Sequence, residues 1–424
     1  MRYVVRPSSI AGSVRIPPSK SHTIRALLIG SVASGTSRLH GPLESEDTRA
    51  CLRACRALGA SIEEAGGDWL IEGLGGPPRL PDDVLDVGNS GTTLYLAMGL
   101  AALIDGWTVF TGDEQIRRRT AQPLLSALED LGALARSSRD NGCAPVLIRG
   151  PMRGGSTVLE ARSSQYLSSL LLSAPLAPEE THIRLSLLNE RPYAEMTLRW
   201  LERCGIRVEA SDDRMEFRLP GGQCYRPVSG VIPADFSSAT FFLCAAAITG
   251  SELTLEGLDM ADPQGDKAVV DMLAAMGAAV VCGDGFVRIR GGELRGVDLD
   301  LNATPDALPA LAVVGCFARG TTRLLNVPQA RIKETDRIAT MRQELEGMGA
   351  RVEELDDGLV IHESPLRGAR VHGHHDHRLV MALTVAGLAA TGTTEIETAE
   401  SAAVTFPTFA ELMRSIGADL SEVP

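Results

Sequence analysis

Six copies of one sequence layout follow one another along this chain of 424 residues. Each copy has a polar cluster, an apolar helical run, a turn of small residues and a short strand-like run. The copies span residues 18–41, 88–112, 163–186, 234–257, 304–326 and 375–398. Marker positions in the polar clusters (20, 89, 164, 237, 306 and 376) are separated by 69, 75, 73, 69 and 70 residues. A pitch this regular indicates that each copy folds as one supersecondary unit.

The second half of each copy also repeats. An amphipathic helical run ends at a glycine, which is a common stop signal for helices. These stops are CRALGA (55–60), LEDLGA (128–133), LERCGI (201–206), LAAMGA (273–278), LEGMGA (345–350) and MRSIGA (413–418). A hairpin-like stretch such as RVEELDDGLVIHE (351–363) follows five of them. The unit is therefore predicted as helix, strand, helix and hairpin, an α/β fold of the α+β type with helices laid on small sheets.

The two ends of the chain predict how the copies are grouped. The sixth copy lacks its hairpin, whereas spare strand-like sequence at 2–17 precedes the first copy. We expect the N-terminus to supply the missing strands. This predicts a discontinuous domain, 1–19 plus 234–424, and a continuous domain, 20–233, with three units each and hinges near 19–20 and 233–234.

Composition excludes several classes of protein. A hydrophobic share of 44% rules out a disordered chain, and a net charge of −13 argues against a nucleic-acid or anionic-membrane binder. Only three of the 41 basic residues are lysines, so each lysine is a candidate for a position that needs a compact, titratable ammonium group. Lys20 and Lys333 lie in polar motifs, and Lys267 is expected at the surface.

Targeting and metal signals are weak. The eight cysteines are scattered without a CxxC pair, the N-terminus lacks the layout of a signal peptide, and the apolar runs are short. A cytoplasmic protein is expected. The run from His372 to His377 has no matching ligand pair elsewhere, so no metal site is predicted.

The polar clusters open the apolar helices, where free backbone N–H groups and the helix dipole favour anions. If the three helix N-termini of each domain face one inter-domain cleft, an acidic protein can still hold an anionic substrate. Each cluster also has a plainer interpretation. Ser163 and Ser164 can be simple N-caps, Asp306 can be a capping carboxylate, and Arg119 ends a basic run typical of a solvated surface.

The motifs taken together resemble the EPSP synthase (3-phosphoshikimate 1-carboxyvinyltransferase) family over the whole chain. They are PPSKSHTIRALL, GNSGTT, SSQYLSSLLLSAPLA, DFSSATFFLCAAAI, RIKETDRI, DHRLVMAL and TFPTF. The resemblance implies two domains of three βαβαββ units with parallel helices. It also implies transfer of the enolpyruvyl group of phosphoenolpyruvate to shikimate 3-phosphate, with release of phosphate and without metal or organic cofactor.

The resemblance also assigns site residues. For shikimate 3-phosphate it implies Lys20, Ser21, Arg25, Ser163, Ser164, Gln165, Arg191, Tyr193, Asp306, Gln329 and Lys333. For phosphoenolpyruvate it implies Lys20, Asn89, Gly91, Arg119, Gln165, Arg337, His377 and Arg378. The reaction needs an acid near C3 of phosphoenolpyruvate, a base near the acceptor hydroxyl and cations over the anionic groups. We expect Asp306 as the base and Glu334 with Lys20 to move protons. Lys333 and His377 complete the predicted catalytic set.

Some positions depart from the family pattern. Tyr95 replaces a usual Arg, Glu190 a Ser, Ala234 a Gly, Gln329 an Asn and Val404 a Lys. Glu190 is an awkward neighbour for a substrate phosphate, so affinity and acceptor identity stay open.

The sequence leaves four alternatives to enolpyruvyl transfer to shikimate 3-phosphate. Two are enolpyruvyl transfer to a UDP-amino sugar and enolpyruvyl transfer to another cyclic alcohol. The others are a non-catalytic anion-binding scaffold and an RNA-end cyclase, which the acidic balance disfavours. The expected partners are small-molecule substrates, with neither nucleic acid nor membrane, and the protein is expected to be a monomer.

Overall fold

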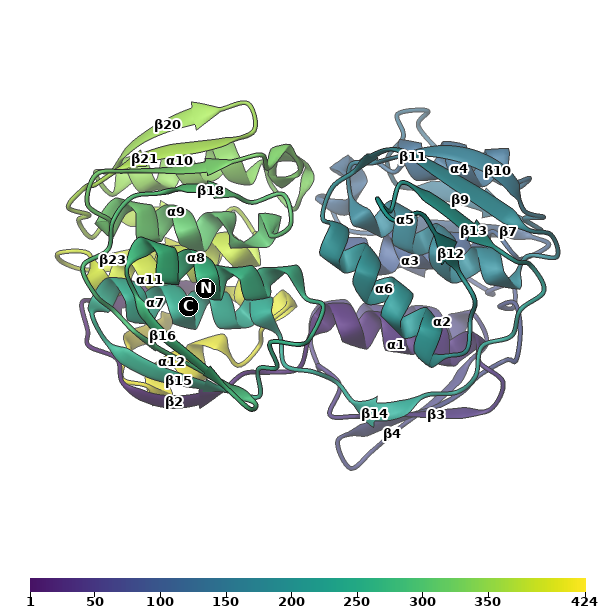
Figure 1. The fold of residues 1–424 in the computed structure, drawn as a ribbon, viewed down its shortest axis with the longest axis horizontal. Coiled ribbons are helices and arrows are strands. Elements are labelled where there is room, and N and C mark those ends of the chain that lie inside the picture. The colour runs from purple at the N-terminus through teal and green to yellow at the C-terminus, as the bar shows by residue number, and fades with distance from the viewer. The chain divides into compact units, whose positions relative to one another are not determined.

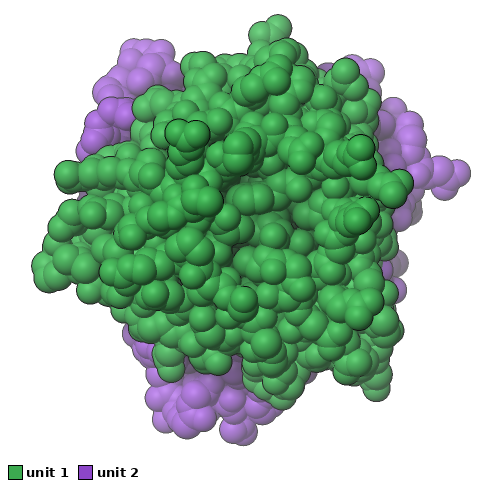
Figure 2. All heavy atoms as spheres, turned by 90° about the vertical axis from the view of Figure 1, so that its left-hand side faces the viewer, with its two compact units in different colours: residues 1–17, 233–424 green, residues 18–232 purple.

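Six four-stranded sheets and twelve α-helices build the fold, and a computed structural model describes all residues from Met1 to Pro424 (Figure 1). The chain separates into two units (Figure 2). Unit 1 comprises Met1–Pro17 and Pro233–Pro424, and unit 2 comprises Pro18–Ile232. The sequence placed these boundaries at 19–20 and 233–234. Each unit has three sheets and its own hydrophobic core.

Unit 2 contains the first three repeats. Its helices are α1 (Lys20–Val32), α2 (Glu46–Ala57), α3 (Gly91–Ala101), α4 (Gln122–Asp130), α5 (Ser164–Ser173) and α6 (Arg191–Arg203). Its strands are β3 (Thr36–His40), β4 (Ser61–Ala65), β5 (Asp68–Glu72), β6 (Leu85–Asp86), β7 (Trp107–Thr111), β8 (Leu134–Ser137), β9 (Val146–Arg149), β10 (Gly155–Ala161), β11 (Thr181–Leu188), β12 (Glu209–Ala210), β13 (Glu216–Leu219) and β14 (Ser229–Val231). The sheet orders are β14-β3-β5-β4, β6-β7-β9-β8 and β10-β11-β13-β12.

Unit 1 contains the last three repeats. Its helices are α7 (Phe236–Thr249), α8 (Ala268–Met276), α9 (Leu308–Phe317), α10 (Arg337–Gly347), α11 (His377–Ala389) and α12 (Phe409–Ser415). Its strands are β1 (Arg2–Arg6), β2 (Gly12–Arg15), β15 (Glu252–Glu256), β16 (Ala279–Gly283), β17 (Phe286–Arg290), β18 (Asp298–Asp300), β19 (Thr321–Leu325), β20 (Arg351–Leu355), β21 (Gly358–His362), β22 (Arg370–His372), β23 (Thr394–Glu397) and β24 (Asp419–Val423). The sheet orders are β16-β17-β15-β2, β18-β19-β21-β20 and β22-β23-β1-β24.

Each complete repeat reads βαβαββ. In the fifth repeat, β18 runs parallel to β19 with α9 between them in the chain. β21 pairs antiparallel with both β19 and β20, and Leu355 lies opposite Gly358 beside the predicted hairpin turn. The first helix of each repeat is buried on nearly all sides, and α7, α9 and α11 contact one another inside unit 1. A helix that is apolar all round belongs in a core, which is where these lie.

The predicted helix stops are confirmed. The last glycine in each of the six motifs adopts a positive φ, from +77° at Gly205 to +114° at Gly277. A side chain at such a position would be strained, so glycine is the residue that ends the helix there without cost.

The N-terminal strands are divided between two sheets, which differs from the prediction that both complete the sixth repeat. β1 pairs with β23 and β24 and fills the place of the absent hairpin strand. β2 instead pairs in parallel with β15 in the fourth repeat. The reason is that β14, which precedes α7 in the chain, pairs with β3 of the first repeat. The fourth repeat thereby lacks a strand of its own at this edge, and β2 supplies it.

Candidate active site

Polar residues cap the buried helices, as the sequence indicated. Ser19, Ser90, Ser163, Asp235 and Asp376 are the N-caps of α1, α3, α5, α7 and α11, and each side chain accepts a bond from a backbone N–H in the first turn. The capping interpretation of Ser163 is thus confirmed. The remaining N–H groups of each first turn are donors suited to an anion.

A buried charge cluster lies in unit 1 at the starts of α10 and α11. We call it the Arg337 cluster, and its members are Asp306, Glu334, Arg337, Asp376 and Arg378. The Arg337 side chain is 1% exposed, and its Nε and Nη2 donate to the two oxygens of Asp376 at 2.8 and 3.1 Å. Its Nη1 donates to Asp306 at 2.7 Å, and its Nη2 also pairs with Glu334.

Arg378 completes this cluster. Its Nη2 lies 2.9 Å from the second oxygen of Asp306, whereas its buried Nε has no hydrogen-bond partner. Burial by itself raises the pKa of Asp306, but the charges of Arg378, Lys333 and Arg337 outweigh burial and hold that pKa below its ordinary value. Burial lowers the pKa of Arg378, but the carboxylates of Asp306, Asp266 and Asp235 together hold that pKa above its ordinary value. The cluster thus keeps an ionised carboxylate beside a donor able to take an anion.

The depressed pKa of Asp306 has a consequence for stability. Its ionisation stabilises the fold above the unfolded pKa of about 3.9, and this stabilisation is lost as pH falls through the lower folded pKa. We expect Asp306→Asn to be less stable than the wild type by a margin that persists from neutral pH to roughly pH 4 and shrinks below it. Urea unfolding across this pH range measures the margin. A margin that disappears already near neutral pH would contradict the assigned cause.

Other predicted residues of unit 1 lie around this cluster. Lys333 ends the 3-10 turn Pro328–Ile332, just before α10, and is half-buried. His377 is buried in the first turn of α11. Gln329 is buried and donates from Nε2 to the carbonyl of Asn302 at 2.9 Å, while its Oε1 has no hydrogen-bond partner.

Lys267 was expected at the surface. That prediction was wrong, since its half-buried ammonium donates to the carbonyls of Met260 and Asp262 at 2.9 and 2.7 Å.

In unit 2, Lys20 and Arg25 are both on α1 but have different surroundings. The Lys20 ammonium lies 3.0 Å from the buried Asp47 carboxylate at the start of α2. Arg25 is 1% exposed, and its guanidinium donates to Thr197, to Ser168 and to the carbonyls of Ser21 and Tyr193. Burial lowers the pKa of Arg25 to about 10, so it stays charged at neutral pH. Arg25 therefore ties α1 to α5 and α6.

The second repeat contributes Asn89, Gly91 and Arg119. The Asn89 amide donates to Asp113 and Gln115, both at 2.6 Å. Gly91 opens α3, and a Cβ atom there would overlap Nη1 of the buried Arg119. Gln165, from the third repeat, donates to Thr92 at 3.1 Å and so lies beside the same helix start. The basic run that looked solvated ends in a buried guanidinium, and the surface interpretation of Arg119 was wrong.

The third repeat holds an internal anion. One oxygen of the buried Glu190 accepts from Ser164 N at 3.1 Å, Ser164 Oγ at 2.9 Å and Ser163 Oγ at 3.3 Å. Next to it, the side chain of Arg191 is 51% exposed and pairs with Glu195, while Tyr193 is half-buried. The structure therefore brings Ser163 and Ser164 together with Glu190 and leaves Arg191 largely in solvent.

One pairing recurs through the repeats. In five of them, the marker residue at the start of the first helix bonds to a residue that follows the next strand, at or before the start of the second helix. The pairs are Lys20 with Asp47, Asn89 with Asp113, Ser164 with Glu190, Ser237 with Asp266, and Asp306 with Arg337. In the fifth repeat the marker Asp306 is the anion and Arg337 is the cation, which is the reverse of Lys20 and Asp47 in the first repeat. In the sixth, Asp376 pairs with Arg337 of the preceding repeat, and the uncharged Val404 is the last residue of the 3-10 turn Ala399–Val404 that precedes α12.

The sequence did not indicate the surroundings of two residues, Asp376 and Tyr95. Asp376 is a marker of the repeat with no predicted site role, yet it is fully buried and bonds to Arg337 and Thr335. An Asp directly before the His-Arg pair at a marker position was the available signal. Tyr95 is a core residue whose hydroxyl donates to the carbonyl of Thr120 at 3.0 Å, so its departure from the family pattern is accommodated by packing.

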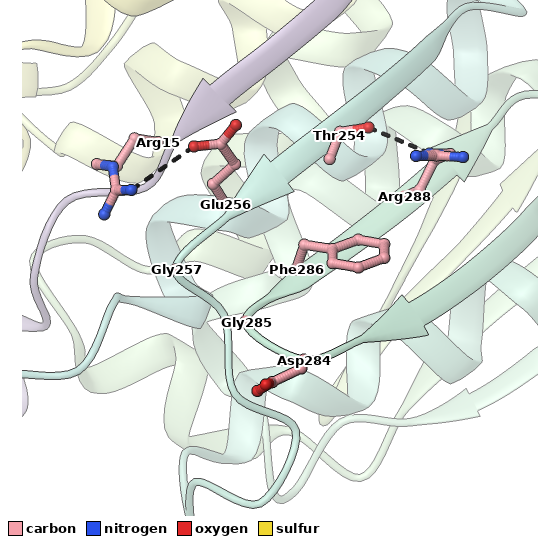
Figure 3. A pocket seen from close by; sticks show the side chains of 8 residues that line it. All are labelled: Arg15, Thr254, Glu256, Gly257, Asp284, Gly285, Phe286 and Arg288. Carbon is pink, nitrogen blue, oxygen red and sulfur yellow. Dashed lines mark hydrogen bonds and ion pairs between the residues drawn. The ribbon is translucent and has the colours of Figure 1, made fainter.

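A pocket of about 490 Å³ lies elsewhere in unit 1, on the strands β2, β15 and β17 (Figure 3). It is lined by Arg15, Thr254, Glu256, Gly257, Asp284, Gly285, Phe286 and Arg288. None of the predicted site residues is among them. No group of three or more His, Cys, Asp or Glu side chains is arranged to hold a metal ion, and no helix has the length and apolarity to cross a membrane.

Comparisons with known proteins agree on one family. The model of the family described as EPSP synthase (3-phosphoshikimate 1-carboxyvinyltransferase) matches residues 4–413. A 3-phosphoshikimate 1-carboxyvinyltransferase of Acetivibrio thermocellus is 54% identical over 421 residues, covering 99% of each chain. One from Methanocella arvoryzae is 47% identical and covers 98% of each chain.

Solved structures give the same picture. An EPSP synthase from Acinetobacter baumannii matches with a TM-score of 0.84 at 29% identity, covering 100% of both chains. The enolpyruvyl transferase NikO from Streptomyces tendae matches with a TM-score of 0.81 at 18% identity, covering 100% of this chain and 98% of its own. At that identity the second likeness speaks for the fold alone.

Proposed function

This chain belongs to the EPSP synthase family, and on that premise we propose that it transfers the enolpyruvyl group of phosphoenolpyruvate to the 5-hydroxyl of shikimate 3-phosphate. The observation that carries the proposal is the Arg337 cluster. It places the ionised carboxylate of Asp306 and the side chain of Glu334 beside two buried guanidinium groups, of which Arg378 keeps an unsatisfied donor. Carboxylates and cations side by side are what the addition of an alcohol to an anionic enol needs.

The reaction proceeds by addition and elimination. The hydroxyl oxygen bonds to C2 of phosphoenolpyruvate and loses its proton, while C3 gains a proton, which gives a tetrahedral ketal phosphate. Phosphate then leaves C2 as a proton is removed from the new methyl group, and the double bond is restored. We assign Asp306 to the hydroxyl. Since its pKa is low, it orients the hydroxyl first and takes the proton only as the new bond makes that proton acidic.

We assign the other roles as the family resemblance implies. Glu334 and Lys20 are assigned to the proton at C3, and Lys333 and His377 to the surroundings of the reacting groups. Phosphoenolpyruvate is held by Lys20, Asn89, Gly91, Arg119, Gln165, Arg337, His377 and Arg378. Shikimate 3-phosphate is held by Lys20, Ser21, Arg25, Ser163, Ser164, Gln165, Arg191, Tyr193, Asp306, Gln329 and Lys333. Arg25 belongs to this second set indirectly, because its buried guanidinium already donates to protein groups, among them the carbonyls of Ser21 and Tyr193, and so positions these two residues.

The acceptor alternatives are not favoured, because the relatives that cover nearly the whole chain are named 3-phosphoshikimate 1-carboxyvinyltransferases. The test is direct. The protein is incubated with phosphoenolpyruvate and either shikimate 3-phosphate or a UDP-amino sugar, and phosphate release and the enol ether product are followed. Turnover only with the UDP-amino sugar, or with neither acceptor, would overturn the proposal. We further propose that the protein is cytoplasmic and monomeric. Sedimentation velocity would measure its mass in solution and so test the monomeric state.

Replacing Gly91 tests the binding of phosphoenolpyruvate. A Cβ at this position requires the guanidinium of Arg119 to move, which we expect to raise the KM for phosphoenolpyruvate by about tenfold while the protein stays folded. Gly347→Ala in α10 is the matched control, because its Cβ would meet nothing within 4 Å. Steady-state kinetics provide the readout. An unchanged KM in Gly91→Ala would remove Arg119 from the phosphoenolpyruvate set.

A further inference from the structure

Glu190 is held in an anion-binding arrangement built by the protein itself. A single oxygen of its carboxylate accepts three hydrogen bonds from Ser163 and Ser164 at the start of α5. The carboxylate is buried, with the whole residue 2% exposed, and Ser164 is equally enclosed. The first turn of α5 adds the favourable field of a helix N-terminus. These donors form what we call the α5 anion site: Ser163 Oγ, Ser164 N and Ser164 Oγ.

The backbone of Glu190 supports this position. Glu190 has φ +56° and ψ +39°, a left-handed conformation that costs a residue other than glycine some free energy. It directly precedes α6, so the strain is located where the chain turns to bring the carboxylate over α5. Burial lowers the pKa of Arg25, and the charges of Tyr193 and Glu190 partly oppose this effect.

The repeats show that such a carboxylate is part of the architecture. Asp47, Asp113 and Asp266 accept from the marker residue in the first, second and fourth repeats, as Glu190 does in the third. Glu190 differs in being the longer residue and in accepting from two consecutive residues of the helix start. It therefore uses the donors that an incoming anion would use.

We propose that Glu190 is an internal competitor for the phosphate group of the acceptor. This inference rests on the proposed function and on the family resemblance, which implies that Ser163 and Ser164 hold that phosphate. A carboxylate and a phosphate cannot both accept from the same three donors, and at that separation their charges repel. Binding of shikimate 3-phosphate therefore requires the Glu190 side chain to leave the α5 anion site. Glu190 sets the affinity for the phosphorylated acceptor and leaves that for phosphoenolpyruvate unchanged.

The experiment measures equilibrium binding without phosphoenolpyruvate. Wild type, Glu190→Gln and Glu190→Ser are titrated calorimetrically with shikimate 3-phosphate, with unphosphorylated shikimate and with inorganic phosphate. Glu202→Gln is the control, because Glu202 is an exposed residue of the same helix and the substitution changes charge equally. Circular dichroism and thermal melting verify the fold of each variant, and Glu190→Gln preserves the size of the side chain and its ability to accept.

We expect both Glu190 variants to bind shikimate 3-phosphate at least about tenfold more tightly than wild type, with no gain for shikimate. Glu202→Gln should match wild type. An unchanged or weakened affinity for shikimate 3-phosphate would overturn the inference. An equal gain for both acceptors would also overturn it, because a merely loosened pocket would produce that result.

Turnover separates this inference from the proposed function. If wild type releases phosphate with both substrates but the variants gain no affinity, the function stands and the competition by Glu190 does not. If wild type fails to turn over but the variants still gain affinity for shikimate 3-phosphate alone, the proposed reaction is wrong and the competition stands. If there is neither turnover nor gain, both are wrong.

Discussion

Replacing Arg337 with alanine is expected to lower the free energy of unfolding by about 3 to 5 kcal/mol and to abolish measurable turnover. The side chain is buried and bonds to Asp306, Glu334 and Asp376. Its removal leaves three carboxylates close together with Arg378 as the remaining guanidinium among them. Like charges in a buried site repel strongly, and neither the fold nor the substrate site can keep its geometry.

Arg342→Ala is the matched control for this prediction. Arg342 lies on the same helix, is 39% exposed and pairs with Glu346 and Glu354, and such surface pairs contribute at most about 1 kcal/mol. Urea unfolding and phosphate release measure the two effects. Arg337→Lys should recover part of the stability, since an ammonium can pair with one or two of the carboxylates but cannot reproduce the planar contact with Asp376. If Arg337→Ala were as stable as Arg342→Ala, the inference that the buried ion pairs of Arg337 stabilise the fold would be wrong.

Neutralising the two proposed acid–base carboxylates should reduce kcat by about 100- to 10,000-fold. Glu334→Gln and Asp306→Asn preserve size and remove charge, so each tests proton transfer more directly than alanine does. We expect the two variants to differ in one readout. Exchange of the C3 hydrogens of phosphoenolpyruvate with solvent deuterium should slow in Glu334→Gln more than in Asp306→Asn, because Glu334 is assigned to C3.

The exposed Glu346 provides the control, since Glu346→Gln removes a carboxylate of α10, the helix that Arg337 opens, at a position away from the Arg337 cluster. Its kcat should stay within about twofold of wild type. A kcat near the wild-type value in either Glu334→Gln or Asp306→Asn would remove that residue from the acid–base set. Equal exchange rates in the two variants would leave the division of roles between them unsupported.

The repeat, its helix starts and its helix ends could be predicted because the signals for them are local. The apolar runs, the capping residues and the glycine stops each act within a few positions of the chain. The division of the N-terminal strands could not be predicted in the same way. Whether β2 joins the fourth or the sixth repeat depends on which sheet lacks an edge strand, and β14 decides this by pairing with β3.

Site residues show the same contrast. The sequence placed Lys20, Ser163, Asp306, Arg337 and Arg378 at or beside helix starts, where the structure has them. It did not reveal that Arg25 is enclosed by α5 and α6, or that Arg119 packs against Gly91. Both side chains are long and flexible, so their end points depend on neighbours that are distant in sequence.

By itself, then, the sequence determined the six units, their order of elements and the polar residues at each helix start, because propensity, periodicity and capping act over short stretches of chain. Only the tertiary structure decided which of these charges meet. Arg337 reaches Asp376 across 39 positions, and Glu190 reaches Ser164 across 26. Such pairs form where helix starts of one or more repeats pack side by side, and burial then makes each unpaired charge too costly to leave alone.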